Sequence, residues 1–343
     1  MWGVRLSPGS FVYSLFGIQF QDEHPNDRQS SLISQFDNLI KHAPTSVERL
    51  IQDGGASPNS GKTQVWIAYW KSHPDYQAWW TDPDVSAFWS SLPPDAGMWR
   101  EIITPHSSRT QHGTNQTTPI GLGHLGDRIP VGDKTGYWGC YRHRMSAEAS
   151  DRMKTPLQGA LSRASAGALS SDCRTVRPGR VHMTRFPENI CFVVEGQDHS
   201  HLTPEETECW FKHFDQLVTQ WIVDLTAAPP ESGILDARLC YYPEGGTFRD
   251  SAPAALNYNK KTQFFYFTDM NHMLRFGQQN KGHVQLRSDF MEAYWPGGPL
   301  SATGQIGLWV ETSVLKEGEL ECEYVGCLEG TGFMPFDSME GFT

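Results

Sequence analysis

Residues 62–67 read Lys-Thr-Gln-Val-Trp-Ile, and residues 261–266 read Lys-Thr-Gln-Phe-Phe-Tyr. β-Branched and aromatic residues fill the second part of each stretch, which predicts a β-strand in both places. Another strand-like run precedes each of them, at residues 11–20 and at residues 189–195. The repeated order predicts two β-α-β units of similar shape within one chain.

Helical patterns separate and follow these strands. Residues 30–42 place apolar side chains at helical spacing, and residues 73–92 form a tryptophan-rich helical segment that breaks near Pro83. In the second unit, the sequence predicts one helix that begins at Thr203 and another that begins at Asp269. Helices are thus predicted beside strands in both units.

The two units are predicted to be halves of one compact structural unit. The first half covers residues 1–106, and the second covers residues 136–343, with final strands predicted at residues 305–314 and 320–328. Between the halves, residues 107–135 are rich in small polar residues and poor in large apolar ones, which predicts a linker loop on the surface.

The composition narrows the functional classes. The chain has 343 residues, a net charge of −11 and no basic stripe, which argues against binding to nucleic acid. Aromatic residues make up 12% of the chain, with twelve tryptophans, which suits packing around a large flat ligand. Seven scattered cysteines form no Cys-x-x-Cys pair, and no apolar run reaches membrane-spanning length, so we expect a cytoplasmic protein without disulfides.

Residues 137–144 read Tyr-Trp-Gly-Cys-Tyr-Arg-His-Arg, an aromatic run that ends in two arginines at alternate positions. On a strand, Trp138, Cys140, Arg142 and Arg144 would share one face. That face suggests a cavity wall that holds an oxygen-bearing or anionic group. The alternative is an edge strand whose arginines reach solvent.

Short stretches in a common order carry a resemblance to a known family; they are residues 16–22, 69–71, 99–105 and 136–139, Arg142 with Arg144, and residues 196–198, 240–241 and 330–332. With them, the chain resembles the haem-containing aldoxime dehydratases, phenylacetaldoxime dehydratases included, over nearly its whole length. The resemblance implies two ferredoxin-like halves that form a dimeric-type α+β barrel within one chain, with antiparallel sheets and flanking helices. It also implies haem b, ferrous in the active form, bound by the second half.

The resemblance implies that His283 is the ligand of the haem iron. On a helix, His283, Arg287 and Met291 share one face, which suits one side of a porphyrin. Phe192, Trp309 and Val310 are expected to complete the cofactor pocket. The alternative for His283 is a histidine at the start of a helix that faces solvent.

The family reaction converts R–CH=N–OH to a nitrile and water, and it needs an acid near the oxygen that leaves. The resemblance implies an arginine, a serine and a distal histidine for this task. The arginine matches Arg144, but the serine position holds Glu195 and the histidine position holds Val310. Since no histidine follows His283 in the chain, the usual proton donor is absent.

Several hypotheses remain open for this divergent member. In the first, Glu195 replaces the missing acid, and the protein is a lyase for a small apolar aldoxime or a related N–O substrate. In the second, Glu195 and Arg144 form a distal pair for peroxide activation or for other N–O or N–N chemistry. In the third, the protein is a haem-binding or degenerate barrel without catalysis. For Glu195 itself, the alternative is a salt bridge with Arg144 that holds the cavity shut. The chain is expected to be a monomer or a homodimer.

Overall fold

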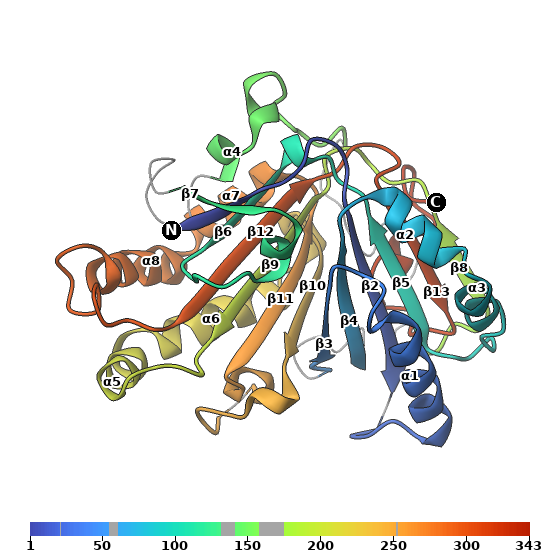
Figure 1. The fold of residues 1–343 in the computed structure, drawn as a ribbon, viewed down its shortest axis with the longest axis horizontal. Helices are drawn as coiled ribbons and strands as arrows, with labels where there is room; N and C mark the ends of the chain where they lie inside the picture. The colour runs from blue at the N-terminus through green and yellow to red at the C-terminus, as the bar shows by residue number, and fades with distance from the viewer. Residues whose placement is uncertain (21, 55–60, 132–140, 158–174, 252) are drawn as a thin grey trace.

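The computed structural model describes residues 1–20, 22–54, 61–131, 141–157, 175–251 and 253–343. Within these ranges, thirteen strands form one antiparallel sheet, in the order β7-β1-β6-β12-β9-β11-β10-β3-β4-β2-β5-β13-β8. Figure 1 shows that the sheet bends, with helices on the outer side of each half. None of the described helices has the length and apolar character needed to cross a membrane.

The first half is a ferredoxin-like unit. Its strands lie in the order β3-β4-β2-β5, and its helices cover the outer face (Figure 1). The elements are β2 (Val12–Phe20), α1 (Asp27–Ile40), β3 (Ser46–Gln52), β4 (Lys62–Trp70), α2 (His73–Trp80), α3 (Pro83–Ser90) and β5 (Met98–Ile103). The predicted break near Pro83 is confirmed, because Asp82 caps α3 there.

The second half repeats this arrangement in the strand order β12-β9-β11-β10. Its elements are β9 (Cys191–Asp198), α5 (Pro204–His213), α6 (Asp215–Thr226), β10 (Ile234–Tyr241), β11 (Lys260–Phe267), α7 (Met270–Gln279), α8 (Lys281–Tyr294) and β12 (Gly307–Val314). Thr203 and Asp269 cap α5 and α7, as predicted. The two ferredoxin-like halves are therefore confirmed.

Strand exchange ties the halves together. Strand β3 pairs with β10, and the strand that follows each half crosses to the other half. Thus β6 (Thr110–Thr114) pairs with β12, and β13 (Leu320–Val325) pairs with β5. The outer strands are β1 (Trp2–Arg5), β7 (Asp127–Pro130) and β8 (Arg180–Met183).

This exchange corrects the prediction of a linker loop at residues 107–135. Strand β6 lies within that segment and is buried between β1 and β12. Its polar side chains misled the prediction, because they bond across the sheet instead of facing water. The Oγ1 atom of Thr110 lies 3.0 Å from Oγ of Ser313, and Gln111 Nε2 donates to Thr312 Oγ1 at 3.0 Å.

The predicted strand at residues 137–144 is also corrected where it can be compared. Residues 137–140 lie outside the described part of the chain, and Tyr141–Arg144 form the one-turn helix α4. Arg142 bonds to Glu148 and to Asn271 of α7, while Arg144 bonds to Gln111 of β6. The two arginines thus bond to different elements. A helical turn allows this, whereas on a strand both side chains would point to the same face.

Two glycine–tryptophan pairs fix the correspondence between the halves. Gly17 pairs with Trp99, and Gly196 pairs with Trp309. A Cβ atom would lie 2.2 Å from the Trp99 ring at Gly17 and 1.9 Å from the Trp309 ring at Gly196, so neither position accepts a side chain. In this register Val65 corresponds to Thr262. The shared Lys-Thr-Gln triplets are therefore two residues out of structural register, although the order of elements is repeated.

Glu101 in the first half and Glu311 in the second are buried at equivalent positions, and each bonds to a tyrosine of the other half. Tyr266 donates to Glu101 Oε2 at 2.8 Å, and Tyr69 donates to Glu311 Oε1 at 3.3 Å. Arg238 forms a buried ion pair with Glu101 at 2.5 Å. Glu311 forms no ion pair with any described residue, and burial raises the pKa of its carboxyl to about 8.

We expect Glu311 to make the protein less stable as pH rises. Its pKa is about 8 in the folded state and about 4.3 in an unfolded chain, so folding takes up a proton between these values. The free energy of unfolding should therefore fall above about pH 5, by up to about 1.4 kcal/mol per pH unit. Glu311→Gln mimics the protonated form. In urea unfolding from pH 5 to pH 8.5, its advantage over the wild type should grow with pH.

Glu101→Gln is the matched control, because it removes the charge that pairs with Arg238. It should lower the free energy of unfolding by about 3 kcal/mol at every pH in this range. Parallel stability curves for the wild type and Glu311→Gln would contradict the prediction.

Candidate functional site

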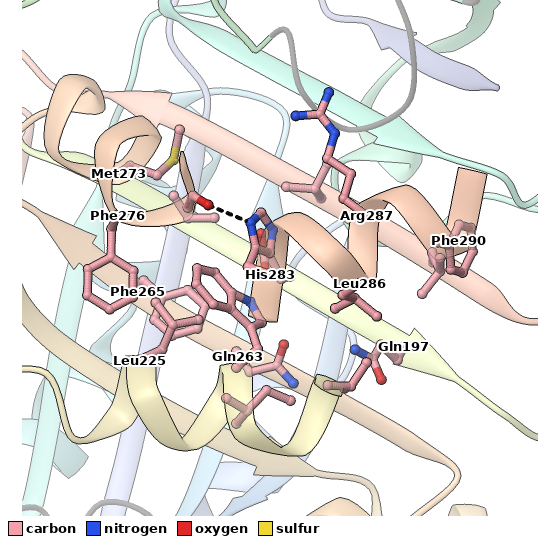
Figure 2. Close-up of a pocket in the computed structure, with 18 of the residues that line it drawn as sticks. Gln197, Leu225, Gln263, Phe265, Met273, Phe276, His283, Leu286, Arg287 and Phe290 are labelled. Carbon is pink, nitrogen blue, oxygen red and sulfur yellow. Dashed lines mark hydrogen bonds between the residues drawn. The ribbon is translucent and has the colours of Figure 1, made fainter. Parts of the chain in front are cut away.

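A cavity of about 560 Å³ lies between helices α5 to α8 and the outer face of β9, β11 and β12. Figure 2 shows His283, Leu286 and Arg287 on one helix, with Gln197 and Gln263 on strands that face it. Much of the wall is apolar or aromatic; this part includes Trp221, Leu225, Phe265, Phe276, Phe290 and Met291. The volume falls within the range of about 300–1,000 Å³ that is usual for ligand and cofactor sites.

At the equivalent position of the first half, the described side chains are closely packed aromatic rings. There Phe36 packs on Phe16 with ring centroids 4.8 Å apart, and on Trp66 at 4.9 Å. In the register set by the glycine–tryptophan pairs, Phe16 corresponds to Glu195 and Trp66 to Gln263. Two large aromatic rings of the first half are thus replaced by two smaller polar side chains in the second.

The start of α8 positions His283. The side chain of Asn280 caps this helix, and its Oδ1 accepts a hydrogen bond from the backbone N–H of His283 at 2.8 Å. The Nδ2 atom of Asn280 donates to Asp224 of α6 at 2.7 Å. Asn280 therefore caps the first turn of α8 and also bonds this turn to the neighbouring helix α6.

The imidazole of His283 is held in one tautomer. Its Nδ1 lies 2.9 Å from the carbonyl oxygen of Gly277, which can only accept, so Nδ1 carries the proton. Burial lowers the pKa of His283, which keeps the ring neutral and leaves the Nε2 lone pair available. A Cβ atom at Gly277 would lie 3.2 Å from Cε1 of the imidazole, so a side chain there would require the ring to shift by a few tenths of an ångström.

The surroundings of His283 leave that lone pair accessible. Trp221 stacks on the imidazole with centroids 4.1 Å apart and planes 27° apart. A stacked ring covers the face of the imidazole, whereas the Nε2 lone pair lies in the ring plane. One turn further on, Arg287 lines the cavity with an exposed side chain, and Met291 follows it. The predicted helical face is therefore the face that meets the cavity.

Glu195 lies on the opposite, strand side of the cavity. It forms no hydrogen bond or ion pair with any residue in the described part of the chain, and burial raises the pKa of its carboxyl to about 7. Its cross-strand partners are Val310 on β12 and Gln263 on β11, and both line the cavity. A carboxyl group with this pKa can hold or release a proton near neutral pH.

Arg144 is placed outside the set of residues that line the cavity. Its Nη1 atom bonds to Gln111 Oε1 at 3.3 Å, on the strand beyond Val310. The adjacent Met145 packs in the apolar cluster that contains Val310. Arg144 is thus at the margin of the site, and it forms no ion pair with Glu195.

The other predicted wall residues divide between the two faces of the sheet. Val310 lines the cavity as expected. Trp309 also contributes to the lining, but its indole packs over Gly196. The prediction for Phe192 is wrong, because alternation along β9 turns it into the barrel interior, where it packs on Tyr13 with ring centroids 5.3 Å apart.

Two polar residues of the site were missed in the sequence. Gln263 alternates with Phe265 and Phe267 on β11, and this spacing was the available signal for a side chain on the cavity side. The second, His199 just after β9, is buried between the rings of Trp210 and Phe248. Its Nε2 lies 3.4 Å from Oε1 of the cavity residue Gln197, and burial lowers its pKa.

Comparison with known proteins places these observations in a family. The model of the haem-containing dehydratase family matches residues 14–333. A phenylacetaldoxime dehydratase from Bacillus sp. (strain OxB-1) is 25% identical over 350 residues, covering 98% of this chain and 91% of that protein. An aliphatic aldoxime dehydratase from Rhodococcus globerulus is 24% identical over 334 residues, covering 94% of this chain and 86% of that protein.

Solved structures show the same fold. A crystal structure of an aldoxime dehydratase in complex with butyraldoxime superposes with a TM-score of 0.77 at 19% identity, covering 97% of this chain and 88% of that one. A second aldoxime dehydratase structure gives a TM-score of 0.76 at 18% identity, covering 97% and 90%.

The site fits a haem. It offers one neutral imidazole with a free Nε2, a cavity with aromatic and aliphatic walls, and the cation of Arg287 for an acidic substituent. The described residues contain no cluster of three or more His, Cys, Asp or Glu that could hold a metal ion by themselves. A porphyrin itself supplies four nitrogens to iron, so one further imidazole from the protein, such as that of His283, would suffice to hold it.

We expect His283→Ala to abolish stable haem binding. The variant removes the axial ligand, so the Soret absorbance that purified protein acquires with haem should be lost or shifted. His213→Ala, on the exposed side of α5, is the control and should bind like the wild type. An unchanged spectrum in His283→Ala would show that another group binds the iron.

Gly277→Ala tests how the ligand is held. Alanine favours a helix interior by about 1 kcal/mol over glycine, so the haem-free variant should be no less stable than the wild type. Its Cβ atom would press on the imidazole, and the affinity for haem should fall about tenfold. Equal affinity in a titration of both proteins with haem would contradict this account.

Proposed function

Because the chain belongs to the haem-containing dehydratase family, we propose that it is a haem-dependent lyase that converts an aldoxime to a nitrile and water. The observation that carries the proposal is Glu195, a partly exposed carboxyl in the cavity wall with a pKa raised to about 7 and no partner among the described residues. The reaction needs a proton at the hydroxyl oxygen, and Glu195 is the group in the wall that can deliver one.

A bound haem would supply a ferrous iron as a Lewis acid for the oxime nitrogen. His283 would hold the cofactor from the helix side through Nε2, with its tautomer fixed by the carbonyl of Gly277. From the strand side, the protonated carboxyl of Glu195 donates to the hydroxyl oxygen. As the N–O bond breaks, that oxygen leaves as water, and the Glu195 carboxylate then accepts the proton from carbon. The reaction is balanced without an external oxidant or reductant.

The register of the sheet supports Glu195 as a replacement for the family's distal histidine. Glu195 and Val310 are direct cross-strand partners, so their side chains occupy neighbouring space on the same face. A carboxyl on β9 can therefore reach the region that a side chain at position 310 would occupy. Val310 in turn adds apolar surface, which suits a substrate with a small apolar substituent.

The alternatives receive less support. Peroxide activation by a distal Glu195–Arg144 pair needs the two side chains together, whereas Arg144 bonds to Gln111 at the margin of the site. A barrel that binds haem without catalysis gives no reason for a carboxyl in the cavity wall that bonds to none of the described residues. Burial of such a group costs stability, and sites of this kind are commonly functional.

We expect reduced, haem-loaded protein to convert phenylacetaldoxime to phenylacetonitrile. The value of kcat/KM should fall about tenfold per unit above about pH 7, because the protonated carboxyl is the active form. Glu195→Gln cannot transfer the proton, so its turnover should be about 10²–10⁴-fold slower and should lose this alkaline decline. Product can be quantified by chromatography.

Glu205→Gln, on the exposed face of α5, is the matched control and should retain full activity. Absence of nitrile with several aldoximes would exclude the lyase. Peroxide-dependent oxidation of a dye that disappears in Glu195→Gln would favour the alternative haem chemistry.

Arg144 remains a candidate for a supporting role. Its helix α4 packs at the rim through Met145, so the guanidinium can influence the cavity without lining it. We expect Arg144→Gln to lower turnover of phenylacetaldoxime by less than Glu195→Gln does, about tenfold at most. A loss as large as that of Glu195→Gln would place Arg144 in direct contact with the substrate.

A further inference from the structure

We propose that Gln263 binds the hydroxyl oxygen of the substrate beside Glu195. The inference deepens the function proposed above and rests on it. Gln263 is on β11, directly opposite Glu195 on β9, and both side chains line the cavity. Figure 2 shows Gln263 on the strand side, below His283.

The carboxamide of Gln263 has a donor that the protein does not use. The residue is 2% exposed, and its Nε2 atom has no hydrogen-bond partner among the described residues. An unsatisfied buried donor lowers the stability of the folded protein. A ligand oxygen at this position would recover that stability, which explains why a glutamine lies here in place of an apolar residue.

The spacing of the pair suits one shared oxygen atom. Direct cross-strand partners have Cβ atoms about 4.5–5.5 Å apart, so the ends of Glu195 and Gln263 can reach the same ligand atom. Gln263 would donate an N–H to a lone pair of the hydroxyl oxygen. The other lone pair would then face the acidic proton of Glu195, which transfers as the N–O bond breaks and the oxygen leaves as water. Gln263 loses and gains no proton in this step.

Gln197 is less suited to this task. It lines the cavity two residues further along β9 and is only partly buried, so an unbonded Nε2 donor costs less there than at Gln263. Its cross-strand partner on β11 is Lys261, not Gln263. The unpartnered donor next to the acid therefore belongs to Gln263.

Gln263→Met removes the donor and keeps most of the volume. Haem-loaded, reduced protein is titrated with phenylacetaldoxime and with phenylacetonitrile, which has the same substituent without the oxygen, and binding is followed in the Soret band. The affinity for the aldoxime should fall about tenfold, while the affinity for the nitrile should change less than twofold. Gln285→Met, on the exposed face of α8, is the control and should match the wild type for both.

A second measurement separates binding from a structural role. Because Nε2 is unsatisfied, Gln263→Met should have a Tm equal to or above that of the wild type, with or without haem. Equal losses of affinity for both ligands, or a lower Tm, would show a structural role and overturn the inference. If Gln263→Met binds the aldoxime as tightly as the wild type does, while the wild type makes nitrile, only this inference is overturned. A wild-type protein that neither binds nor converts aldoximes would remove the proposed function and this inference together.

Discussion

The site depends on one constraint: the sheet of the second half is buried on both faces. Along β9, Phe192 and Val194 therefore belong to the barrel interior, while Val193 and Glu195 belong to the cavity. A shift of one residue in register would exchange these sets and place a carboxyl inside the barrel. The alternation of side chains along β9 that forms the core therefore also determines which face carries the Glu195 carboxyl.

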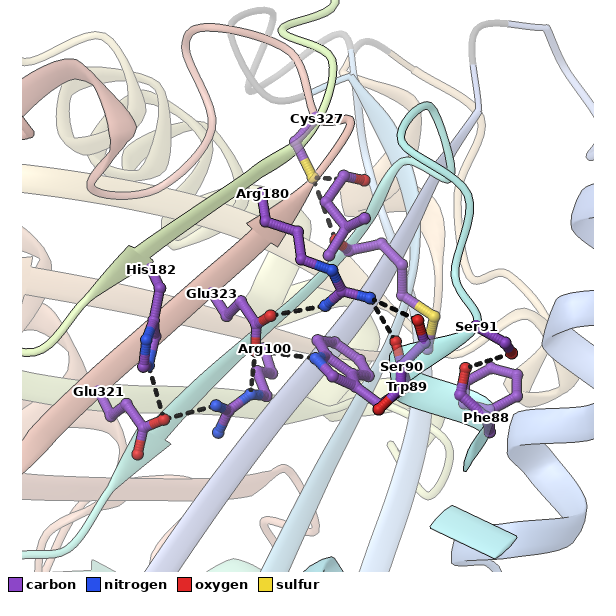
Figure 3. A network of polar contacts seen from close by, with 12 residues as sticks. Phe88, Trp89, Ser90, Ser91, Arg100, Arg180, His182, Glu321, Glu323 and Cys327 are labelled. Carbon is purple, nitrogen blue, oxygen red and sulfur yellow. Dashed lines mark hydrogen bonds and ion pairs between the residues drawn. The ribbon is translucent and has the colours of Figure 1, made fainter. Parts of the chain in front are cut away.

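The two halves have the same strand order and differ in the side chains that pack on the outer face of the sheet. In the first half, aromatic side chains of α1, α2 and α3 fill the outer face, and Trp80 stacks on the guanidinium of Arg100 at 4.3 Å. Figure 3 shows that Arg100 also joins a network with Glu321, Glu323 and Arg180. Arg100 corresponds to Val310, so the position that is closed by ion pairs in one half is an open apolar wall in the other.

The sequence predicted those features that depend on local chemistry. Helix caps at Thr203 and Asp269 were identified because their side chains bond to the backbone a few residues away. The helical face of His283 followed from spacing alone. Features that depend on distant partners were not accessible: β6 is polar in sequence and becomes a buried strand only because β1 and β12 flank it.

The same limit applies to the site. The family resemblance identified Glu195 as a departure, but no local pattern shows that Gln263 lies beside it, since the two residues are 68 positions apart in the chain. Phe192 was misplaced because a strand with both faces buried has no polar alternation to orient it. Even the repeated Lys-Thr-Gln triplet, which indicated the duplication, is out of structural register by two residues.

The positions of the polar side chains in the sheet affect how a substrate would lie in the cavity. The resemblance implies a polar pair at positions 195 and 310, on β9 and β12; in this chain the polar pair is Glu195 and Gln263, on β9 and β11. Under the proposed function, the oxygen-binding position would lie one strand away from the position that the resemblance implies, about 4.8 Å across the sheet. An aldoxime bound with its hydroxyl over β9 and β11 would place its apolar part against Val310. A valine at position 310 in place of a histidine would then go with both a different proton donor and apolar space beside it.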